Sequence, residues 1–241
     1  MQTMNTPHGA GDLRVICAGG FKAAMEKIAP RFEATTGCKL AITIGTPADT
    51  RRLMGGGTPF DAAVVTAHTL TDEVAASIDR QSRFSVAKSP VGMGVRETLA
   101  VPAISSEQSF RTAIAAVSTI ALSDPRAGTN LAEQILAAAT AIGIRAELES
   151  KVRYVMGPGF VVAKRVAAGE ADAVMTLATE IISAQGIRYL GAIPDSMKLG
   201  TVFDAAIAKT AADVPAAHSF LAFLRTGEAG DLMRATGLVK L

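Results

Sequence analysis

The fold class is decided by residues 13–66, which read LRVICAGGFKAAMEKIAPRFEATTGCKLAITIGTPADTRRLMGGGTPFDAAVVT. Three short apolar runs in this stretch have the length and composition of buried strands, and they lie at residues 13–17, 40–44 and 60–66. Between the first two, apolar side chains recur from Phe21 to Phe32 at the spacing of one helix face. A shorter helix is predicted over residues 48–54, where three glycines end it. Strand, helix, strand, helix, strand with short connections predicts a doubly wound α/β fold.

A second α/β set follows between about residues 87 and 191. Its strands are predicted at 91–95, 119–122, 152–155, 173–176 and 187–190, with helices at 110–116, 131–140, 160–168 and 178–184. The tail returns to a strand at 201–207 and to helices from Pro215 and over 229–235. Two extended crossings, near 82–88 and 190–200, connect the sets, so we expect two lobes joined by two hinge strands. Residues 1–86 and 192–241 would form lobe I and residues 87–191 lobe II, each around a doubly wound mixed sheet.

Composition and charge exclude several classes of protein. The chain has 241 residues, and 49% of them are hydrophobic, which is enough for a packed core and excludes a disordered chain. A net charge of +2 provides no broad positive field, so we expect no nucleic-acid partner. Two cysteines exclude a disulfide-dense scaffold and a four-ligand zinc cluster, and His8, His68 and His218 are too scattered for a metal site. We therefore expect no metal and no cofactor, and no apolar run is long enough to span a membrane.

The N-terminal residues and the cysteines bear on the cellular compartment. Residues 1–12 are polar and lack the basic and apolar segments of a secretory leader. The sequence therefore predicts either a cytoplasmic protein or one whose leader has been removed. Cys17 and Cys38 are expected to be unpaired thiols, with a disulfide between them as the alternative.

The loops that follow the predicted strands are small and polar. In open α/β sheets ligands bind beyond the carboxyl ends of the strands, and helix N-termini there offer backbone N–H groups to anions. The candidate donors in these loops are Gly19, Gly20, Thr46, Thr66, Gly128, Thr129, Gly159 and Thr176. Glycine lets a ligand approach the backbone, and threonine hydroxyls donate hydrogen bonds to oxygen. Each glycine alone is explained by a turn, so the prediction of a neutral site for an oxyanion or carboxylate rests on several such loops facing one cleft.

Two side chains in these loops could carry charge to a ligand. Arg126 could bind a carboxylate or oxyanion, and the alternatives are a solvated arginine or one paired with Asp124. His68 could act as an acid or base, but a surface histidine that caps a helix is the expected role. Asp61 and Asp172 precede strands, at the opposite sheet edge, and are expected to be structural.

Catalytic motifs are missing from the sequence. It contains no Gly-x-Ser-x-Gly elbow, no phosphate-loop lysine and no His-Glu-x-x-His motif. Carboxylate pairs suited to acid/base work are absent from the predicted strand ends. No Trp and only two tyrosines, Tyr154 and Tyr189, are present, so the cleft is poorly suited to stacking a sugar or a base. A binding role for a compact anion therefore has more support than covalent or metal catalysis.

Several segments taken together resemble a known family. They are residues 13–25, 29–33 and 59–65 in the first set, 123–128 and 169–174 in the second, and 216–229 with Gly237 in the tail. In order and spacing they resemble the molybdate-type periplasmic solute-binding proteins over nearly the whole chain. The resemblance implies a two-lobed, type II periplasmic-binding-protein fold whose cleft closes on an anion. It also implies a periplasmic monomer that delivers its ligand to the membrane permease of an ABC transporter.

The sequence departs from the molybdate pattern at the ligand donors. Molybdate binders place a serine after the first strand, where Gly19 and Gly20 stand, and Thr46 matches their second serine. Their tyrosine donor is replaced at Met175-Thr176, and Arg126 is not part of their pattern. These departures disfavour molybdate and favour another anion, such as a carboxylate. Residues 157–160 resemble a divergent branch of the family that is similar to trans-aconitate isomerase.

Three functions follow from these expectations. The first is a solute-binding protein that captures a small anion for an ABC-type transporter. The second is an isomerase of an unsaturated tricarboxylate, for which His68 or Lys22 would have to move the proton. The third is a cytoplasmic effector-binding sensor, although the sequence lacks the helix-turn-helix of a complete regulator. The sequence leaves open which anion is bound, whether it is turned over, and the native compartment and oligomeric state.

Overall fold

The computed structural model describes residues 11–241, which fold into two compact units. Unit 1 consists of the described residues up to Lys88 together with Val202–Leu241, and unit 2 is Ser89–Thr201. The N-terminal segment on which the prediction about a leader rests lies almost wholly outside the described residues. The hinge role of the two crossings, and the lobe boundaries at 86/87 and 191/192, stay predictions.

Unit 1 is built on a sheet with the strand order β2-β1-β3-β9. These strands are β1 (Leu13–Ala18), β2 (Leu40–Gly45), β3 (Ala62–Thr66) and β9 (Gly200–Ile207). β1 runs parallel to β2 and β3, and β9 runs antiparallel to β3. β4 (Phe84–Arg96) begins in this unit, where β10 (Val239–Lys240) pairs antiparallel with it.

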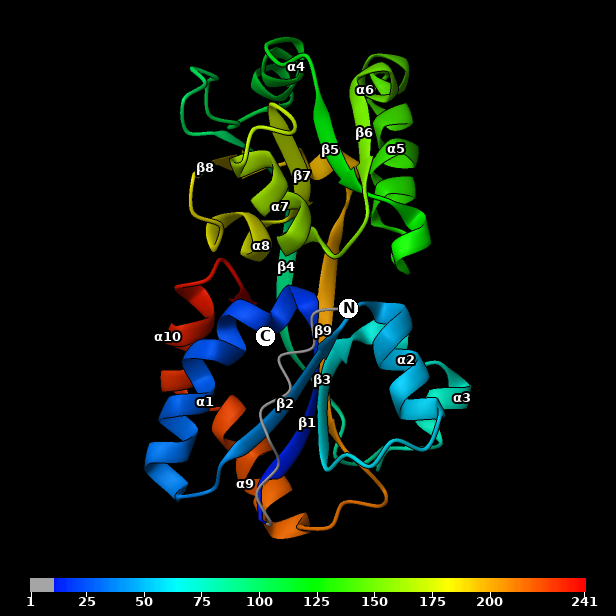
Figure 1. The fold of residues 1–241 in the computed structure, drawn as a ribbon, viewed down its shortest axis with the longest axis vertical. Coiled ribbons are helices and arrows are strands. Elements are labelled where there is room, and N and C mark those ends of the chain that lie inside the picture. The colour runs from blue at the N-terminus through cyan, green and yellow to red at the C-terminus, as the bar shows by residue number, and fades with distance from the viewer. Residues whose placement is uncertain (1–10) are drawn as a thin grey trace. The chain divides into compact units, whose positions relative to one another are not determined.

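Helices cover both faces of the unit 1 sheet (Figure 1). One face carries α2 (Pro47–Gly55) and α3 (Asp72–Ala75), whose Met54 and Val74 join Ile16 in one buried cluster. The other carries α1 (Lys22–Thr36), α9 (Val214–Leu224) and α10 (Gly227–Arg234). Phe32 of α1 packs edge to face on Phe220 of α9 with ring centroids 5.4 Å apart. Two 3-10 turns, η1 (Gly19–Phe21) and η2 (Ala67–Thr69), follow β1 and β3.

Unit 2 has a mixed sheet with the strand order β8-β4-β7-β5-β6. Its other strands are β5 (Ile120–Ser123), β6 (Val152–Val155), β7 (Ala173–Leu177) and β8 (Ile187–Ala192). β5 runs parallel to β6 and β7, whereas β4 is antiparallel to β7 and β8. The helices are α4 (Glu107–Ala115), α5 (Leu131–Ala141), α6 (Arg145–Lys151), α7 (Gly159–Ala167) and α8 (Ala178–Ile182), with turns η3 (Pro125–Ala127) and η4 (Asp195–Met197).

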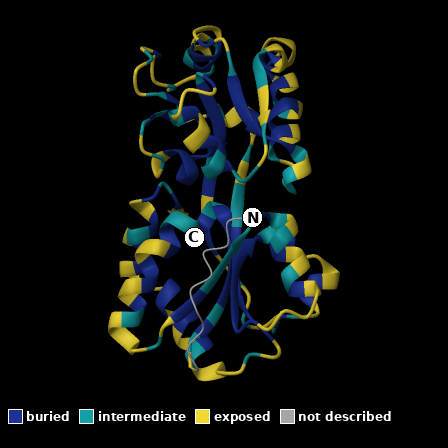
Figure 2. Ribbon diagram, in the orientation of Figure 1, coloured by how far each residue is buried: buried dark blue, intermediate teal, exposed yellow. Residues whose placement is uncertain are grey.

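The strands and the inward sides of the helices form the core of each unit (Figure 2). In unit 2, Val162 and Val166 of α7 and Ile181 of α8 pack with Val174 of β7. Within residues 11–241, none of the helices has the length and apolar character needed to cross a membrane. The strand orders and the covering helices confirm the predicted α/β fold with mixed sheets in both units.

The two aspartates at the amino ends of strands have the structural role expected for them. Asp61 accepts hydrogen bonds from the Arg14 guanidinium at 2.8 Å and from the backbone N–H groups of Arg14 and Ala212. Asp172 is bound in the same way by Arg96 at 2.8 Å and by the backbone of Ser118 and Thr119. Cys17 and Cys38 are both free thiols in the described part of the chain, so the disulfide alternative is wrong.

Candidate functional site

The carboxyl ends of β1, β2 and β3 meet at one edge of the unit 1 sheet because the three strands are parallel. Gly19 and Gly20 lie there in η1, directly after β1, with Gly19 buried and Gly20 half-buried. No side chain of the described residues caps this turn. The first N–H groups of a helical turn lack partners within the turn, so η1 presents backbone donors that an anion could accept.

Thr46 follows β2 and is held by a capping box at the start of α2. Its Oγ1 donates to Asp49 Oδ2 at 2.8 Å and accepts from the Asp49 N–H at 3.2 Å. The Thr46 N–H also donates to Asp49, at 3.2 Å. The hydroxyl predicted to meet a ligand therefore already has a structural partner in a carboxylate of its own helix.

Thr66 ends β3 and lies beside two polar neighbours in η2. Its Oγ1 is 2.7 Å from Thr69 Oγ1 and 3.4 Å from His68 Nε2. The His68 side chain lies at the surface, and its pKa is below the ordinary value because the ring is partly desolvated and faces the positive charge of Arg51. A histidine with a lowered pKa is mostly uncharged at neutral pH, so His68 can offer one hydrogen bond but little charge.

Arg83 brings a cation to the same edge of unit 1, and sequence reasoning missed it. Its guanidinium is 2.6 Å from the buried carboxylate of Asp204 and 3.5 Å from the carbonyl oxygen of Ala67, in the turn after β3. Arg83 belongs to an extended crossing and lies 16 residues along the chain from Ala67. Only the strand order, which places β9 with Asp204 beside β3, brings the two together.

The corresponding edge of unit 2 is formed by the carboxyl ends of β5, β6 and β7. Arg126 follows β5 in η3 and forms a two-pronged ion pair with Asp124, with Nε–Oδ1 at 3.0 Å and Nη2–Oδ2 at 2.6 Å. The Arg126 side chain is 81% exposed and that of Asp124 only 8%. The guanidinium lowers the pKa of Asp124, so the pair is ionised, as the alternative interpretation of Arg126 expected.

Gly128 and Thr129 complete the loop that leads from η3 to α5. Gly128 has a φ of 82°, a left-handed conformation that favours glycine, and it ends η3. Thr129 Oγ1 accepts a hydrogen bond from the Leu131 N–H at 3.4 Å. Both residues are half-buried at the strand edge, so a turn and a cap account for the residue types.

Glu180 in α8 occupies the region where Gly159 and Thr176 were predicted to bind a ligand. Thr176 Oγ1 donates to Glu180 Oε2 at 2.6 Å. Burial raises the pKa of Glu180 above its ordinary value, against the opposing effect of hydrogen bonds from Thr176 and from the backbone of Phe160, Leu177 and Gly159. The sequence signal that could have found it is the spacing of four residues between Thr176 and Glu180, one helical turn beyond the strand end.

The predicted ligand donors of unit 1 and unit 2 thus differ in the hydrogen-bond and ion-pair partners that they already have. In unit 2, Arg126, Gly159 and Thr176 are engaged by the carboxylates of Asp124 and Glu180. In unit 1 the uncapped turn at Gly19–Gly20 and the hydroxyl of Thr66 lie side by side at the ends of the paired strands β1 and β3. Within residues 11–241, acidic, histidine and cysteine side chains do not gather in any group of three that could hold a metal ion.

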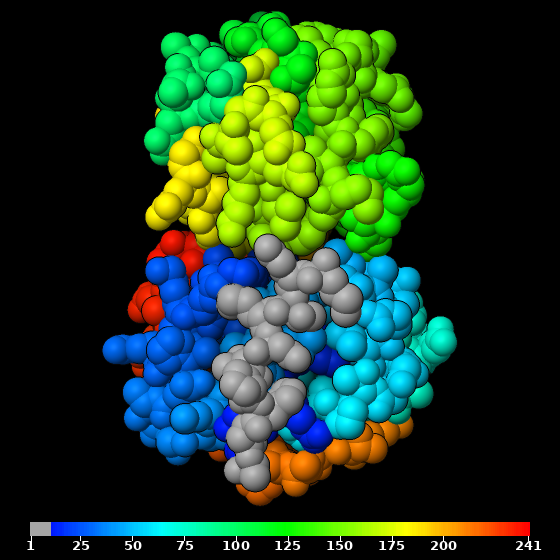
Figure 3. Space-filling model, viewed as in Figure 1, coloured from blue at the N-terminus to red at the C-terminus, as the bar shows by residue number. Residues whose placement is uncertain are grey.

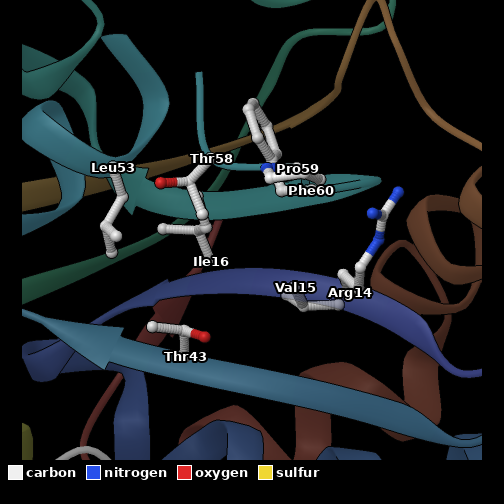
Figure 4. A pocket seen from close by; sticks show the side chains of 8 residues that line it. All are labelled: Arg14, Val15, Ile16, Thr43, Leu53, Thr58, Pro59 and Phe60. Atoms are coloured by element: carbon white, nitrogen blue, oxygen red, sulfur yellow. The ribbon is translucent and has the colours of Figure 1, made fainter. Parts of the chain in front are cut away.

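A separate pocket of about 390 Å³ lies in unit 1 between β1, β2 and the segment that leads into β3 (Figure 4). It is lined by Arg14, Val15, Ile16, Thr43, Leu53, Thr58, Pro59 and Phe60. None of the predicted ligand donors is among these residues. Its one charged group, Arg14, is paired with Asp61, so the pocket is not the predicted anion site.

Comparison with known proteins gives both a family and a fold. The sequence pattern of the family described as bacterial extracellular solute-binding protein matches residues 13–239. An aconitate isomerase of a Pseudomonas species is 25% identical over 232 residues, which cover 94% of this chain and 87% of that protein.

Two solved structures have the same fold. The periplasmic molybdate-binding protein of Azotobacter vinelandii superimposes with a TM-score of 0.75 at 21% identity, covering 95% of this chain and 99% of that one. The substrate-binding domain of a molybdenum ABC transporter of Clostridium difficile, which is described as putative, gives 0.73 at 17% identity, covering 95% and 99%. At these identities the two structures show the fold alone.

Proposed function

Because the chain belongs to the bacterial extracellular solute-binding protein family, we propose that it captures a small anion and delivers it to an ABC-type transporter. The observation that carries the proposal is the uncapped turn at Gly19–Gly20, at the carboxyl ends of parallel strands. Backbone N–H groups in such a turn bind anions without a countercharge. The names of the two structural neighbours, a molybdate-binding protein and a component of a molybdenum transporter, support an anionic ligand. A periplasmic location is part of the proposal, in keeping with the description of the family as extracellular.

The ligand contacts proposed first are those of unit 1. Gly19 and Gly20 would donate from the backbone and Thr66 from its hydroxyl, and Thr46 would contribute if its hydroxyl left Asp49. In unit 2, Arg126, Gly128 and Thr129 stay candidates, with Arg126 shared between the ligand and Asp124.

A panel of anions tests the proposal. The melting temperature of the protein is measured with molybdate, tungstate, sulfate, phosphate and a series of di- and tricarboxylates. A specific ligand raises the melting temperature with the logarithm of its concentration, because it binds only the folded state. Sodium chloride at the same ionic strength is the control. No rise with any of these anions contradicts the proposal.

A second candidate function is isomerisation of an unsaturated tricarboxylate. It is supported by the 25% identity to an aconitate isomerase over 94% of this chain. The assay is incubation with trans-aconitate in D₂O, followed by NMR, which detects both a shifted double bond and exchanged protons. If trans-aconitate binds without either change, the protein is a binder of that anion and not its isomerase.

A further inference from the structure

The pocket of about 390 Å³ in unit 1 is framed by three parts of the chain (Figure 4). Ile16 of β1 and Thr43 of β2 are paired in register, so their side chains share one face of the sheet. Figure 4 shows Leu53 of α2 and Thr58 across the pocket from Thr43. The pocket therefore lies between the sheet on one side and the end of α2 on the other.

The segment of residues 58–60 is folded back over the end of α2. The chain turns at Gly57, whose φ of 75° is left-handed and favours glycine. The Thr58 N–H then donates to the Leu53 carbonyl at 3.3 Å. Thr58 is exposed, and α2 forms part of the visible surface of unit 1 (Figure 3). This wall of the pocket is thus held by a backbone hydrogen bond and lies at the surface of the unit.

The lining is mostly apolar, with one cation at its end. Ile16 and Phe60 belong to the buried cluster of unit 1, and Leu53 packs against that cluster. The Arg14 guanidinium donates from Nε and Nη2 to Asp61, at 2.8 Å each. In the part of the chain that the structure describes, this pair leaves the Nη1 hydrogens of Arg14 to another acceptor.

The carboxylate of Asp61 does not depend on Arg14 alone. Besides the guanidinium, the backbone N–H groups of Arg14 and Ala212 donate to it, at 2.9 and 2.7 Å. These four hydrogen bonds are about as many as an ionised carboxylate accepts. Because backbone donors also stabilise the charge of Asp61, the Arg14 guanidinium can serve a second anionic group.

We propose that this pocket is a second binding site of the protein, for a small monocarboxylate with an apolar body. The carboxylate would accept from Arg14 Nη1, and the body would lie between Ile16 and Leu53. Binding pockets combine such an apolar lining with a few polar groups. A cavity of about 150 Å³ binds benzene, so about 390 Å³ has room for up to about fifteen non-hydrogen atoms. A second charge on the ligand would meet apolar walls, which disfavours dicarboxylates.

This site is separate from the donors of the proposed function. Arg14 lies at the start of β1, whereas Gly19 and Gly20 follow the other end of that strand. The second site therefore does not rest on the proposed function, and the two can be tested independently.

Phenylacetate is the probe, and phenylacetamide, which has nearly the same shape and no charge, is the matched control. Titration of isotope-labelled protein, followed by NMR, reports which backbone N–H groups sense the ligand. We expect phenylacetate to shift the signals of residues 14–16, Thr43, Thr58 and Phe60, with a Kd of about 1 mM or lower. Phenylacetamide should bind about tenfold or more weakly, because it lacks the charge that Arg14 recognises.

A variant that fills the pocket tests the location. Thr43→Phe places a ring in the space between the sheet and α2, and it should weaken phenylacetate binding about tenfold or more. Ile42→Phe is the control, because Ile42 is the preceding residue of β2, is half-buried as Thr43 is, and is not among the lining residues. It should change the affinity less than about twofold. If Thr43→Phe does not fold, Leu53→Phe takes its place.

Several results would overturn the second site. They are no shifted signals at about 10 mM phenylacetate, equal affinities for the acid and the amide, and equal losses in Thr43→Phe and Ile42→Phe. Shifts confined to Gly19, Gly20 and Thr66 would also do so, since phenylacetate would then bind only the donors of the proposed function. An anion of the panel that raises the melting temperature, beside a pocket that phenylacetate leaves unchanged, supports the proposed function and contradicts the second site.

Discussion

At the scale of single residues, Gly159 is the position most sensitive to a small change. A Cβ there would overlap the buried side chains of Glu180 and Thr176. We expect Gly159→Ala to lower the free energy of unfolding by about 2–3 kcal/mol, the usual cost of overpacking a rigid core. Chemical denaturation measures it.

Gly227→Ala is the matched control for Gly159. Gly227 is the first residue of α10, as Gly159 is of α7, and apart from its chain neighbours and its own helix backbone no atom of residues 11–241 lies within 4 Å of a Cβ built on it. That variant should change stability by less than about 1 kcal/mol, in either direction. Equal losses in the two variants would contradict the described contact of Glu180 with the backbone.

Thr66 offers a test of the proposed ligand contacts. Thr66→Val removes the hydroxyl proposed to donate to the anion, and we expect it to weaken binding about tenfold, the effect of one hydrogen bond to a charged group. Thr69→Val breaks the same Thr66–Thr69 hydrogen bond but keeps the Thr66 hydroxyl. It should therefore change affinity by less than about twofold. Titration of both variants with the ligand found in the panel checks this, and equal losses would show that Thr66 acts only through Thr69.

The sequence predicted which residues lie at the strand ends better than it predicted which residues they contact. It placed Thr176 and Gly159 at strand ends, and it named Asp124 as a possible partner of Arg126, which the structure confirms. It did not find Glu180 or Arg83, because each reaches its position through tertiary structure. Glu180 meets α7 from a different helix, and Arg83 meets the turn after β3 from 16 residues further along the chain.

At the scale of secondary-structure elements, the Arg14–Asp61 pair ties the start of β1 to the start of β3. Burial raises the pKa of Asp61, but hydrogen bonds from Arg14 and from the backbone of Arg14 and Ala212 outweigh it, so the pKa is below its ordinary value. A carboxyl group whose pKa is lowered in the folded state stabilises the protein above its unfolded pKa. That contribution is lost as the pH falls from about 4 through the folded pKa.

Asp61→Asn should therefore lower the free energy of unfolding by about 2 kcal/mol at pH 7 and flatten its fall below about pH 4. Denaturation curves from pH 7 to pH 3 measure both effects. Asp231→Asn is the control, because Asp231 pairs with Arg234 at an exposed surface and should contribute less than about 0.5 kcal/mol. Parallel pH curves for the wild type and Asp61→Asn would contradict the role given to Asp61.

Strand β4 shows what limits prediction at this scale. The sequence indicated a strand at 91–95 interrupted by Gly92 and Gly94, whereas β4 runs without a break from Phe84 to Arg96. The glycines are there for packing. A Cβ at Gly94 would lie 2.5 Å from Ile181 Cγ2, and one at Gly92 would lie 2.5 Å from the Tyr189 ring. Close approach of other elements cannot be distinguished from a turn in a single sequence.

The parallel strands were predictable, as was the five-residue helix α8, but helix α6 was not. β1, β2, β3, β5, β6 and β7 were all expected within a few residues, and all of them except the half-exposed β6 are compact apolar runs between turn residues. Helix α6, at Arg145–Lys151, was missed, since only Leu148 among its residues is buried and so no apolar periodicity marks it.

At the scale of the whole molecule, the two units differ in how the chain builds them. Unit 2 is one continuous segment, Ser89–Thr201, whereas unit 1 combines the described residues up to Lys88 with Val202–Leu241. The second part of unit 1 supplies β9, which pairs with β3, and α9, whose Phe220 packs on Phe32. Unit 1 therefore needs both of its chain segments, because the second one supplies β9 and α9.

We expect a fragment of residues 89–201 to fold alone and to melt cooperatively, because its buried cluster is formed within the fragment. A fragment of residues 11–88 should not fold, because it lacks β9 and α9. Circular dichroism on heating shows which of the two fragments melts cooperatively. A mixture of the 11–88 fragment with a peptide of residues 202–241, which supplies the missing elements, is the control. A cooperative melt of residues 11–88 alone would contradict this division of the chain.

The contact of Gly159 with Glu180 and Thr176 also constrains how this protein can diverge. An alanine at residue 159 would overlap those two side chains, so a larger residue there costs least in a descendant that has already changed them. Loss of Glu180 needs only one nucleotide, because glutamate and alanine codons differ at a single base. A change at residue 180 is thus one mutational step away, whereas a change at Gly159 costs least after it, so this one contact favours an order in which substitutions accumulate.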